Sequence, residues 1–320
     1  MKNIIITGIS GQDGIFLSNH IINNSPRSRI LGITRSQEGK GFHSKLKNLN
    51  SKYEGDILLS TTNLDNPDSV YSLIKDFNPD YISNLSGPSS PYESIQNPSK
   101  YIQIENIFNN LTNSLIELNN FCNFFQASSS EMFANENAPR LNENSPLSGN
   151  SPYAEYKIRN HLKVQNFNEK YDWKIFSGIM FNHESEFRDN NYLLMKIINT
   201  AYSISIGNIQ DLVVGSTEYV RDWSFAGDMA NAIYKIANFG INPTYVIGSG
   251  IGHSILDMIK IVFEFFSLDY EKYLRIDSDL LRDGDAQVIV ADPKILKDEL
   301  SWNCELSFRD LIHRCVKQKL

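Results

Sequence analysis

Apolar runs alternate with amphipathic stretches through the first half of the chain. The β-branched run at residues 4–7 predicts a strand, and the apolar residues between Phe16 and Ile22 recur at helical spacing after it. The same alternation predicts strands at 30–34, 57–59, 81–85, 123–127 and 173–180, and helices at 68–77, at 102–121 and from Pro152 onward. Strands that alternate with helices are typical of an α/β fold, here a Rossmann-type doubly wound parallel sheet.

The pattern is less regular beyond residue 181. We expect a first domain at residues 1–180 and a smaller C-terminal substrate-binding lobe made mainly of 181–320, with segments of about 211–247 returning to the first domain. The elements predicted in this half are strands at 211–214 and 244–247, helices at 226–239, at 255–266 and from Pro293 and Ser307, and a turn or sheet edge at Arg221-Asp222-Trp223.

A glycine-rich turn separates the first strand from the first helix. Gly8, Gly11 and Gly14 stand there, with Gln12 and Asp13 between the last two. Glycines in this context let the backbone approach a pyrophosphate, whose charge the following helix N-terminus stabilises. The turn therefore predicts dinucleotide binding, the alternative being an ordinary strand-to-helix turn.

The end of the second strand distinguishes the two nicotinamide cofactors. An acid there binds the adenosine ribose hydroxyls of NAD, whereas a cation accommodates the 2′-phosphate of NADP. This chain has Arg35 and Ser36 and no acid at that point. NADP is therefore the predicted cofactor, unless Arg35 is simply a solvated surface charge.

Candidate catalytic side chains follow the strand at 123–127. Ligands of open parallel sheets bind beyond the carboxyl ends of the strands, so we expect the serines at 128–130 and Glu131 to face the cofactor cleft. Tyr153 and Lys157 stand four residues apart on one helix face. The ammonium would favour the phenolate form of the Tyr, whose unperturbed pKa is about 10. The alternatives are a chance pair on a surface helix and, for Glu131, a helix-capping or surface acid.

Composition limits the class of protein. The 320 residues are 41% hydrophobic and carry a net charge of -7, which argues against a nucleic-acid surface. Cys122, Cys304 and Cys315 lack metal-ligand spacing and suit a reducing compartment. Without a signal-like segment or an apolar stretch long enough for a bilayer, we expect a cytoplasmic protein with no metal, nucleic-acid or membrane partner.

With these residues in place, the chain resembles the extended short-chain dehydrogenases/reductases and, among them, the GDP-mannose 4,6-dehydratase family. The Gly-Gln-Asp-Gly form of the glycine turn and the Asn-His-Glu-Ser run are more specific than the Tyr and Lys. Differences at Ser129, Asn63, Met195 and Val220 leave a different base, a modified hexose or a heptose open. The matching segments are Thr7 to Gly14, Gln126 to Glu131, Ser151 to Ala154, Phe181 to Ser185 and Arg221 to Trp223.

The resemblance implies a lyase of deoxysugar biosynthesis that converts a GDP-hexose, GDP-mannose or a close relative, into a 4-keto-6-deoxy sugar nucleotide. Tyr153 would take the proton of the C4 hydroxyl, assisted by Lys157, while Ser129 binds the C4 oxygen. Glu131 would remove the C5 proton and, with Ser130, help the C6 hydroxyl leave as water. A tightly bound NADP would be regenerated in each turnover, and the protein would be a homodimer or homotetramer.

His183, with Glu184 beside it and no second ligand at helical spacing, is expected to be structural rather than metal-binding.

The resemblance also implies two sets of binding residues. The expected cofactor-binding residues are Gly8, Gly11, Gln12, Asp13, Gly14, Arg35, Ser36, Asn63, Leu64, Leu85, Tyr153, Lys157 and His183. The expected substrate-binding residues are Ser89, Asn182, Lys196, Gly215, Arg221 and Arg282.

Two other functions remain open on the sequence. An NADPH-dependent 4-ketoreductase or a 4-epimerase of the same fold needs only the Ser, Tyr and Lys, so Glu131 is the residue that favours a dehydratase. A non-catalytic NADP-sensing protein would be expected to have lost Tyr153 or Lys157, and both are intact.

Overall fold

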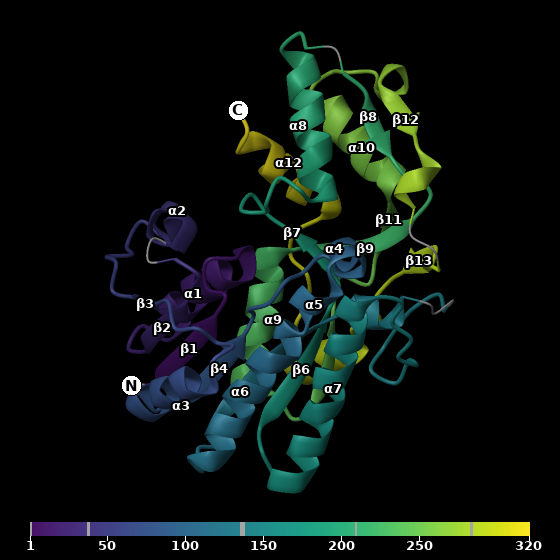
Figure 1. The fold of residues 1–320 in the computed structure, drawn as a ribbon. Helices are drawn as coiled ribbons and strands as arrows, with labels where there is room; N and C mark the ends of the chain where they lie inside the picture. The colour runs from purple at the N-terminus through teal and green to yellow at the C-terminus, as the bar shows by residue number, and fades with distance from the viewer. Residues whose placement is uncertain (1, 37–38, 135–137, 209, 282–283) are drawn as a thin grey trace.

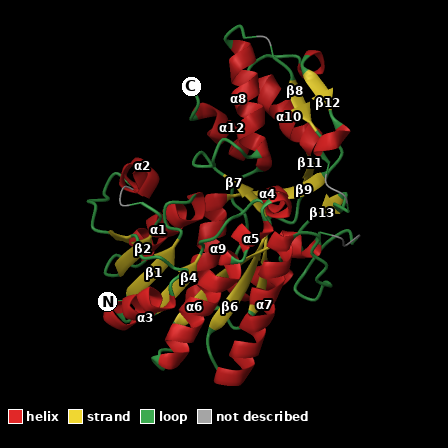
Figure 2. Cartoon of the chain, in the orientation of Figure 1, coloured by secondary structure: helices red, strands yellow, loops and turns green. Residues whose placement is uncertain are grey.

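The computed structural model describes residues 2–36, 39–134, 138–208, 210–281 and 284–320. A seven-stranded sheet, in the order β10-β6-β5-β4-β1-β2-β3, forms its centre, and every neighbouring pair in it is parallel (Figures 1 and 2). The predicted α/β fold class is confirmed. The strands of this sheet are β1 (Asn3–Thr7), β2 (Arg29–Ile33), β3 (Leu58–Ser60), β4 (Tyr81–Asn84), β5 (Asn123–Ser129), β6 (Ile175–Met180) and β10 (Thr244–Ile247).

Helices cover both faces of this sheet because successive strand residues point to opposite sides. Ile5 packs with α3, α6 and α7, whereas Ile4 and Ile6 pack with α1 and α9 in a separate core. The helices of this part are α1 (Gln12–Asn24), α2 (Phe42–Leu49), α3 (Pro67–Phe77), α4 (Pro91–Gln96), α5 (Pro98–Tyr101), α6 (Gln103–Glu117), α7 (Pro152–Tyr171), α9 (Ala226–Phe239) and α11 (Lys294–Leu300).

A smaller lobe with its own apolar core lies beyond the carboxyl ends of the strands (Figure 1). It begins at that edge because β7 starts two residues after β6 ends at Met180. The path then returns to the main sheet through α9 and β10. The elements of the lobe are β7 (Asn182–Glu184), α8 (Leu193–Ser205), β8 (Leu212–Val214), β9 (Val220–Phe225), β11 (Gly252–Ser254), α10 (Ile255–Phe265), β12 (Leu274–Ile276), β13 (Val288–Ile289) and α12 (Phe308–Lys317).

The expected turn or edge at Arg221-Asp222-Trp223 is wrong. These residues lie within β9, which pairs with β11, β13 and β7, and are buried. The Asp222 carboxylate accepts hydrogen bonds from the backbone N–H groups of Ser249 (2.9 Å) and Gly250 (2.8 Å), so a charged residue is accommodated inside the strand. Among the described residues, no helix has the length and apolar character needed to cross a bilayer.

Candidate active site

The glycine turn packs closely against neighbouring backbone, which is possible only because side chains are absent from it. Gly8 adopts a φ of +70°, and a Cβ there would lie 3.0 Å from the backbone of Leu85. A Cβ on Gly14 would lie 2.5 Å from Cα of Ile9. Gly11 is the N-cap of α1 and has no side chain to bind the first N–H groups of the helix. This cradle fits the pyrophosphate of a dinucleotide.

Tyr153 and Lys157 lie on one face of α7, as predicted. The helix begins at Pro152, and the Ser151 hydroxyl caps it by accepting the N–H of Ala154 at 3.2 Å. Both functional side chains are buried, with the Lys157 ammonium 5.6 Å from the centroid of the Tyr153 ring. The phenol and the ammonium therefore share one site.

The pKa values of Tyr153 and Lys157 are shifted by burial and by neighbouring charged and polar side chains. Burial raises the pKa of Tyr153, the hydrogen bond with Ser129 lowers it, and the Glu131 charge raises it. Burial also lowers the pKa of Lys157 to about 8, against the opposing effect of Asp13. The net pKa of Tyr153 is raised, because the hydrogen bond with Ser129 offsets the effect of burial only in part, and the expected lowering by Lys157 is not seen.

Ser129 and Glu131 leave the carboxyl end of β5 together. The Ser129 hydroxyl accepts the backbone N–H of Glu131 at 3.2 Å and caps the short helix Ser130–Phe133. Ser128 does not face the cleft, contrary to expectation. Its hydroxyl lies 2.7 Å from that of Ser177 inside the protein, because alternate residues of a strand point to opposite sides.

A buried chain of hydrogen bonds crosses the strand ends and reaches Lys157. The Thr7 hydroxyl donates to the Asn84 side chain at 2.6 Å, and the Asn84 amide donates to that of Gln126 at 2.7 Å. The carbonyl oxygen of Ala127 then accepts both the Gln126 amide, at 2.9 Å, and the Lys157 ammonium, at 2.7 Å. The ammonium is thereby held at a fixed point beside Tyr153.

The two most specific sequence motifs contact one another. The Gln12 amide donates to the carbonyl oxygen of His183 at 3.0 Å, and the Ser185 hydroxyl donates to Gln12 at 2.8 Å. His183 Nε2 lies 3.0 Å from the Asp13 carboxylate, and His183 Nδ1 donates to the carbonyl oxygen of Phe181. The glycine turn is thus joined directly to β7. Among the described residues, no three His, Cys, Asp or Glu side chains are grouped so as to hold a metal ion.

Arg188 and Tyr192 are further residues of the site that the sequence did not reveal. Arg188 Nε lies 3.1 Å from the Glu184 carboxylate, and its guanidinium stacks 3.5 Å from the centroid of the Tyr192 ring. The positive charge of Arg188 lowers the pKa of Tyr153 and the phenol of Tyr192 raises it, so both groups lie near the candidate base. Glu184 and Arg188 are four residues apart, which is the spacing of an ion pair on a helix, but the sequence around them has no helical pattern that would have indicated such a pair.

The remaining cofactor candidates lie beyond the ends of β2, β3 and β4. Arg35 and Ser36 follow β2 and are exposed, Asn63 follows β3 and is also exposed, and Leu64 beside it is buried. Leu85 directly follows β4 and forms part of the wall against Gly8. These positions surround the edge of the sheet at which an adenosine would lie.

The substrate candidates are distributed over the smaller lobe. Asn182 lies in β7, and Arg221 in β9 is buried with its guanidinium 3.5 Å from the Asp285 carboxylate. Lys196 extends from α8 and donates to the carbonyl oxygen of Val213 at 2.6 Å. Arg282 lies outside the described residues.

Two further candidates mark the borders of this region. Gly215 follows β8, where a Cβ would lie 3.1 Å from the side chain of Leu281. Ser89 lies in the loop after β4 and is exposed. Its hydroxyl is 2.6 Å from that of Tyr192. Ser89 therefore reaches from the first domain to the smaller lobe.

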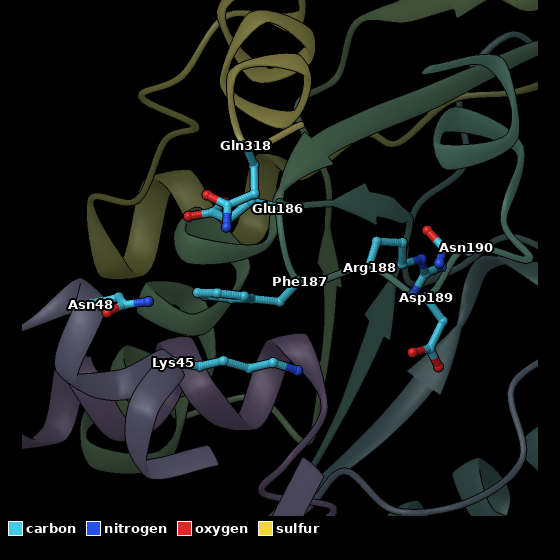
Figure 3. Close-up of a pocket in the computed structure, with 8 residues that line it drawn as sticks. All are labelled: Lys45, Asn48, Glu186, Phe187, Arg188, Asp189, Asn190 and Gln318. Carbon is cyan, nitrogen blue, oxygen red and sulfur yellow. The ribbon is translucent and has the colours of Figure 1, made fainter. Parts of the chain in front are cut away.

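A cavity of about 230 Å³ adjoins the site where α2, the segment after β7 and the end of α12 meet (Figure 3). The Phe187 and Arg188 side chains leave that segment on opposite sides, Phe187 toward Lys45 and Asn48. The cavity shares Arg188 with the candidate active site. Its lining residues are Lys45, Asn48, Glu186, Phe187, Arg188, Asp189, Asn190 and Gln318.

A protein-family model described as GDP-mannose 4,6 dehydratase matches residues 5–315. The chain belongs to this family. GDP-mannose 4,6 dehydratase 2 of Arabidopsis thaliana is 26% identical over an alignment of 336 residues, which spans 100% of this chain and 87% of that protein. The human GDP-mannose 4,6 dehydratase is 25% identical over 98% of this chain and 90% of its own length. The family predicted from the motifs is confirmed.

Solved structures share the fold. The dTDP-glucose 4,6-dehydratase of Bacillus anthracis, in complex with NAD, superimposes with a TM-score of 0.85 at 16% identity over 100% of this chain and 96% of that one. A UDP-glucose 4-epimerase of Stenotrophomonas maltophila gives a TM-score of 0.86 at 17% identity over 100% and 98% of the two chains. The extended short-chain dehydrogenase/reductase fold thus serves both dehydration and epimerisation, so the side chains must distinguish them.

Proposed function

We propose that the chain is a sugar-nucleotide 4,6-dehydratase that converts a GDP-hexose, GDP-mannose or a close relative, into the 4-keto-6-deoxy sugar nucleotide. The observation that carries the proposal is the position of Glu131, two residues after Ser129 at the end of β5, with its charge acting on the phenol of Tyr153. An epimerase or ketoreductase needs no carboxylate there. Membership of the dehydratase family supports the same conclusion.

The proposed cofactor is NADP, held tightly and regenerated in each turnover. The backbone cradle at Gly8, Gly11 and Gly14 would hold the pyrophosphate, and Arg35 after β2 would bind the 2′-phosphate. The sugar-nucleotide enzyme of Bacillus anthracis with a similar fold is bound to NAD, so Arg35 is the residue on which this assignment depends. When bound, the cofactor would supply the chemistry of reversible hydride transfer, from C4 of the sugar and back to C6.

Tyr153 acts first, as the base that takes the proton of the C4 hydroxyl. The hydrogen bond with Ser129 lowers the pKa of the phenol against the larger effect of burial, and the Ser129 hydroxyl would bind the C4 oxygen as the ketone forms. Lys157, fixed by the carbonyl oxygen of Ala127, supplies positive charge beside the phenolate. The residues thus remove one proton from the substrate and hold the resulting carbonyl oxygen.

Glu131 then carries out the elimination. A ketone at C4 makes the hydrogen on C5 acidic enough for a carboxylate to remove. The electron pair of that C–H bond forms the double bond between C5 and C6 as the C6–oxygen bond breaks. Glu131 delivers the proton to the departing hydroxyl, with Ser130 assisting, and water leaves. A carboxylate that first accepts and then gives a proton therefore completes this step. When the hydride returns to C6, C5 must take up one proton, and the proton that Tyr153 took from the C4 hydroxyl balances it.

The smaller lobe would bind the nucleotide. We assign Asn182, Lys196, Gly215 and Arg221 to the nucleoside diphosphate and Ser89 to the sugar. In this proposal residues 1–180 hold the cofactor and the catalytic side chains, and residues 181–320 mainly hold the substrate. We also propose a homodimer or homotetramer, which light scattering of the purified protein would test.

Incubation with GDP-, CDP-, UDP- and dTDP-hexoses without added reductant tests the function. We expect GDP-mannose or a close relative to lose the mass of one water, as read by mass spectrometry. A product of unchanged mass would instead indicate a 4-epimerase. Turnover that requires and consumes NADPH would indicate a ketoreductase.

A further inference from the structure

Tyr192 forms a rigid aromatic surface beside the candidate base. Its ring lies 3.5 Å from the guanidinium of Arg188, which in turn lies 3.1 Å from the buried Glu184 carboxylate. Figure 3 shows the Arg188 side chain on the side of the segment opposite to Phe187. An ion pair behind a stacked ring fixes the orientation of that ring. Tyr192 is therefore held in place before any ligand binds.

The Tyr192 hydroxyl reaches across the boundary between the two lobes. It lies 2.6 Å from the Ser89 hydroxyl, although the two residues are 103 positions apart. Ser89 directly precedes the N-cap of α4, and Ser94 of that helix accepts the backbone N–H of Tyr153 at 3.2 Å. The pair of hydroxyls and the candidate base are thus positioned by the same short helix.

We infer that Tyr192, through its hydroxyl and its ring, extends the sugar contact already assigned to Ser89 into a hexose-recognition element, an inference that rests on the proposed function and deepens it. A hydroxyl both donates and accepts, so two hydroxyls that bond to each other can each exchange that bond for one to a sugar hydroxyl. The fixed ring beside them offers an apolar surface to the C–H groups of a pyranose. The element contacts the hexose and not the nucleotide, so it selects the sugar.

Two conservative variants test this inference by binding rather than turnover. Tyr192→Phe keeps the ring on Arg188 and removes one hydroxyl, and Ser89→Ala removes the other. By calorimetry of the protein loaded with reduced NADPH, which cannot accept a hydride and so prevents turnover, each should raise the Kd of GDP-mannose about three- to tenfold, as expected for one lost hydrogen bond between neutral groups. The Kd of GDP, which lacks the hexose, should not change. Tyr202→Phe, a phenol on α8 that packs against Phe266, is the matched control and should change neither.

An unchanged ratio of the two Kd values in both variants would overturn the inference, even if the melting temperature falls. If the unaltered protein releases water from GDP-mannose while both variants keep its ratio of the Kd of GDP-mannose to the Kd of GDP, this inference alone fails. If the variants raise that ratio but the unaltered protein releases no water, the proposed function fails and the recognition element stands. An unaltered chain that binds no sugar nucleotide would overturn both.

Discussion

His183 Nε2 lies 3.0 Å from the Asp13 carboxylate, in a partly buried pair that joins the glycine turn to β7. Burial alone would raise the pKa of Asp13 and lower that of His183, but their mutual attraction reverses both shifts. Arg188 and Glu184 form a second pair beside them, and the charge of Arg188 opposes the protonation of His183. The pair therefore ties the glycine turn to the first strand of the smaller lobe.

Stability should depend on pH through this pair. His183, whose pKa is raised, contributes fully below about pH 6.5, and its contribution is lost as the pH rises through its folded pKa. Asp13, whose pKa is lowered, contributes above about pH 4, and its contribution is lost as the pH falls through its folded pKa. We expect His183→Gln to cost about 3 kcal/mol near pH 6 and less at pH 9.

Urea unfolding at several pH values measures this difference. The curves of the unaltered protein and of His183→Gln should converge as the pH rises. An Asp13→Asn and His183→Gln double variant should lose less than the sum of the two single losses, because the residues act together. Parallel curves across the pH range would contradict the account.

Glu131→Gln should abolish elimination while leaving cofactor binding intact. The amide keeps the shape of the side chain but cannot take a proton, so release of water should fall at least about a hundredfold. Glu155→Gln is the control, because Glu155 is an exposed acid in the first turn of α7 and should turn over normally. Mass spectrometry of the sugar nucleotide measures both, and unchanged turnover by Glu131→Gln would remove Glu131 from the mechanism.

Arg35→Ala should weaken NADP far more than NAD. Loss of a charged hydrogen bond to the 2′-phosphate should reduce the affinity for NADP about tenfold or more. Arg27→Ala provides the control, since Arg27 is exposed near the opposite end of β2. Fluorescence titration of the cofactor-free protein measures both affinities, and an equal effect on NAD and NADP would reject the assignment.

Gly14→Ala should destabilise the protein and lower its affinity for the cofactor. The added methyl group would meet the backbone of Ile9, which cannot move aside as a flexible side chain would. We expect a loss of about 1–3 kcal/mol in the free energy of unfolding, typical of overpacking. Denaturant titration measures it, and a substitution without effect would show that the turn is looser than the structure indicates.

The main sheet could be predicted from the sequence because its signals are local. The predicted helix at 226–239 and strand at 244–247 coincide with α9 and β10. The predicted helix at 102–121 ends earlier, at Glu117, with Asn119 at a φ of +51° beyond it. In the smaller lobe, α8 was not predicted, since its apolar residues at 193–198 are nearly continuous and lack a clear period.

The site was predictable where neighbours in the sequence are also neighbours in space. The glycine turn and the Tyr153 and Lys157 pair are of this kind. The contacts of His183 with Asp13 and of Tyr192 with Ser89 join residues far apart in the chain, so no local pattern revealed them. Strands such as β13, which has two residues, depend on pairing with β9 rather than on their own sequence.

Transfer of deuterium within the substrate tests the central claim most directly. GDP-mannose that carries deuterium at C4 would be incubated with the purified protein and its bound cofactor, and the product analysed by NMR. The account predicts a 4-keto-6-deoxy product with the deuterium at C6 of the same molecule. Deuterium that remains at C4, or a product without deuterium at C6, would contradict it.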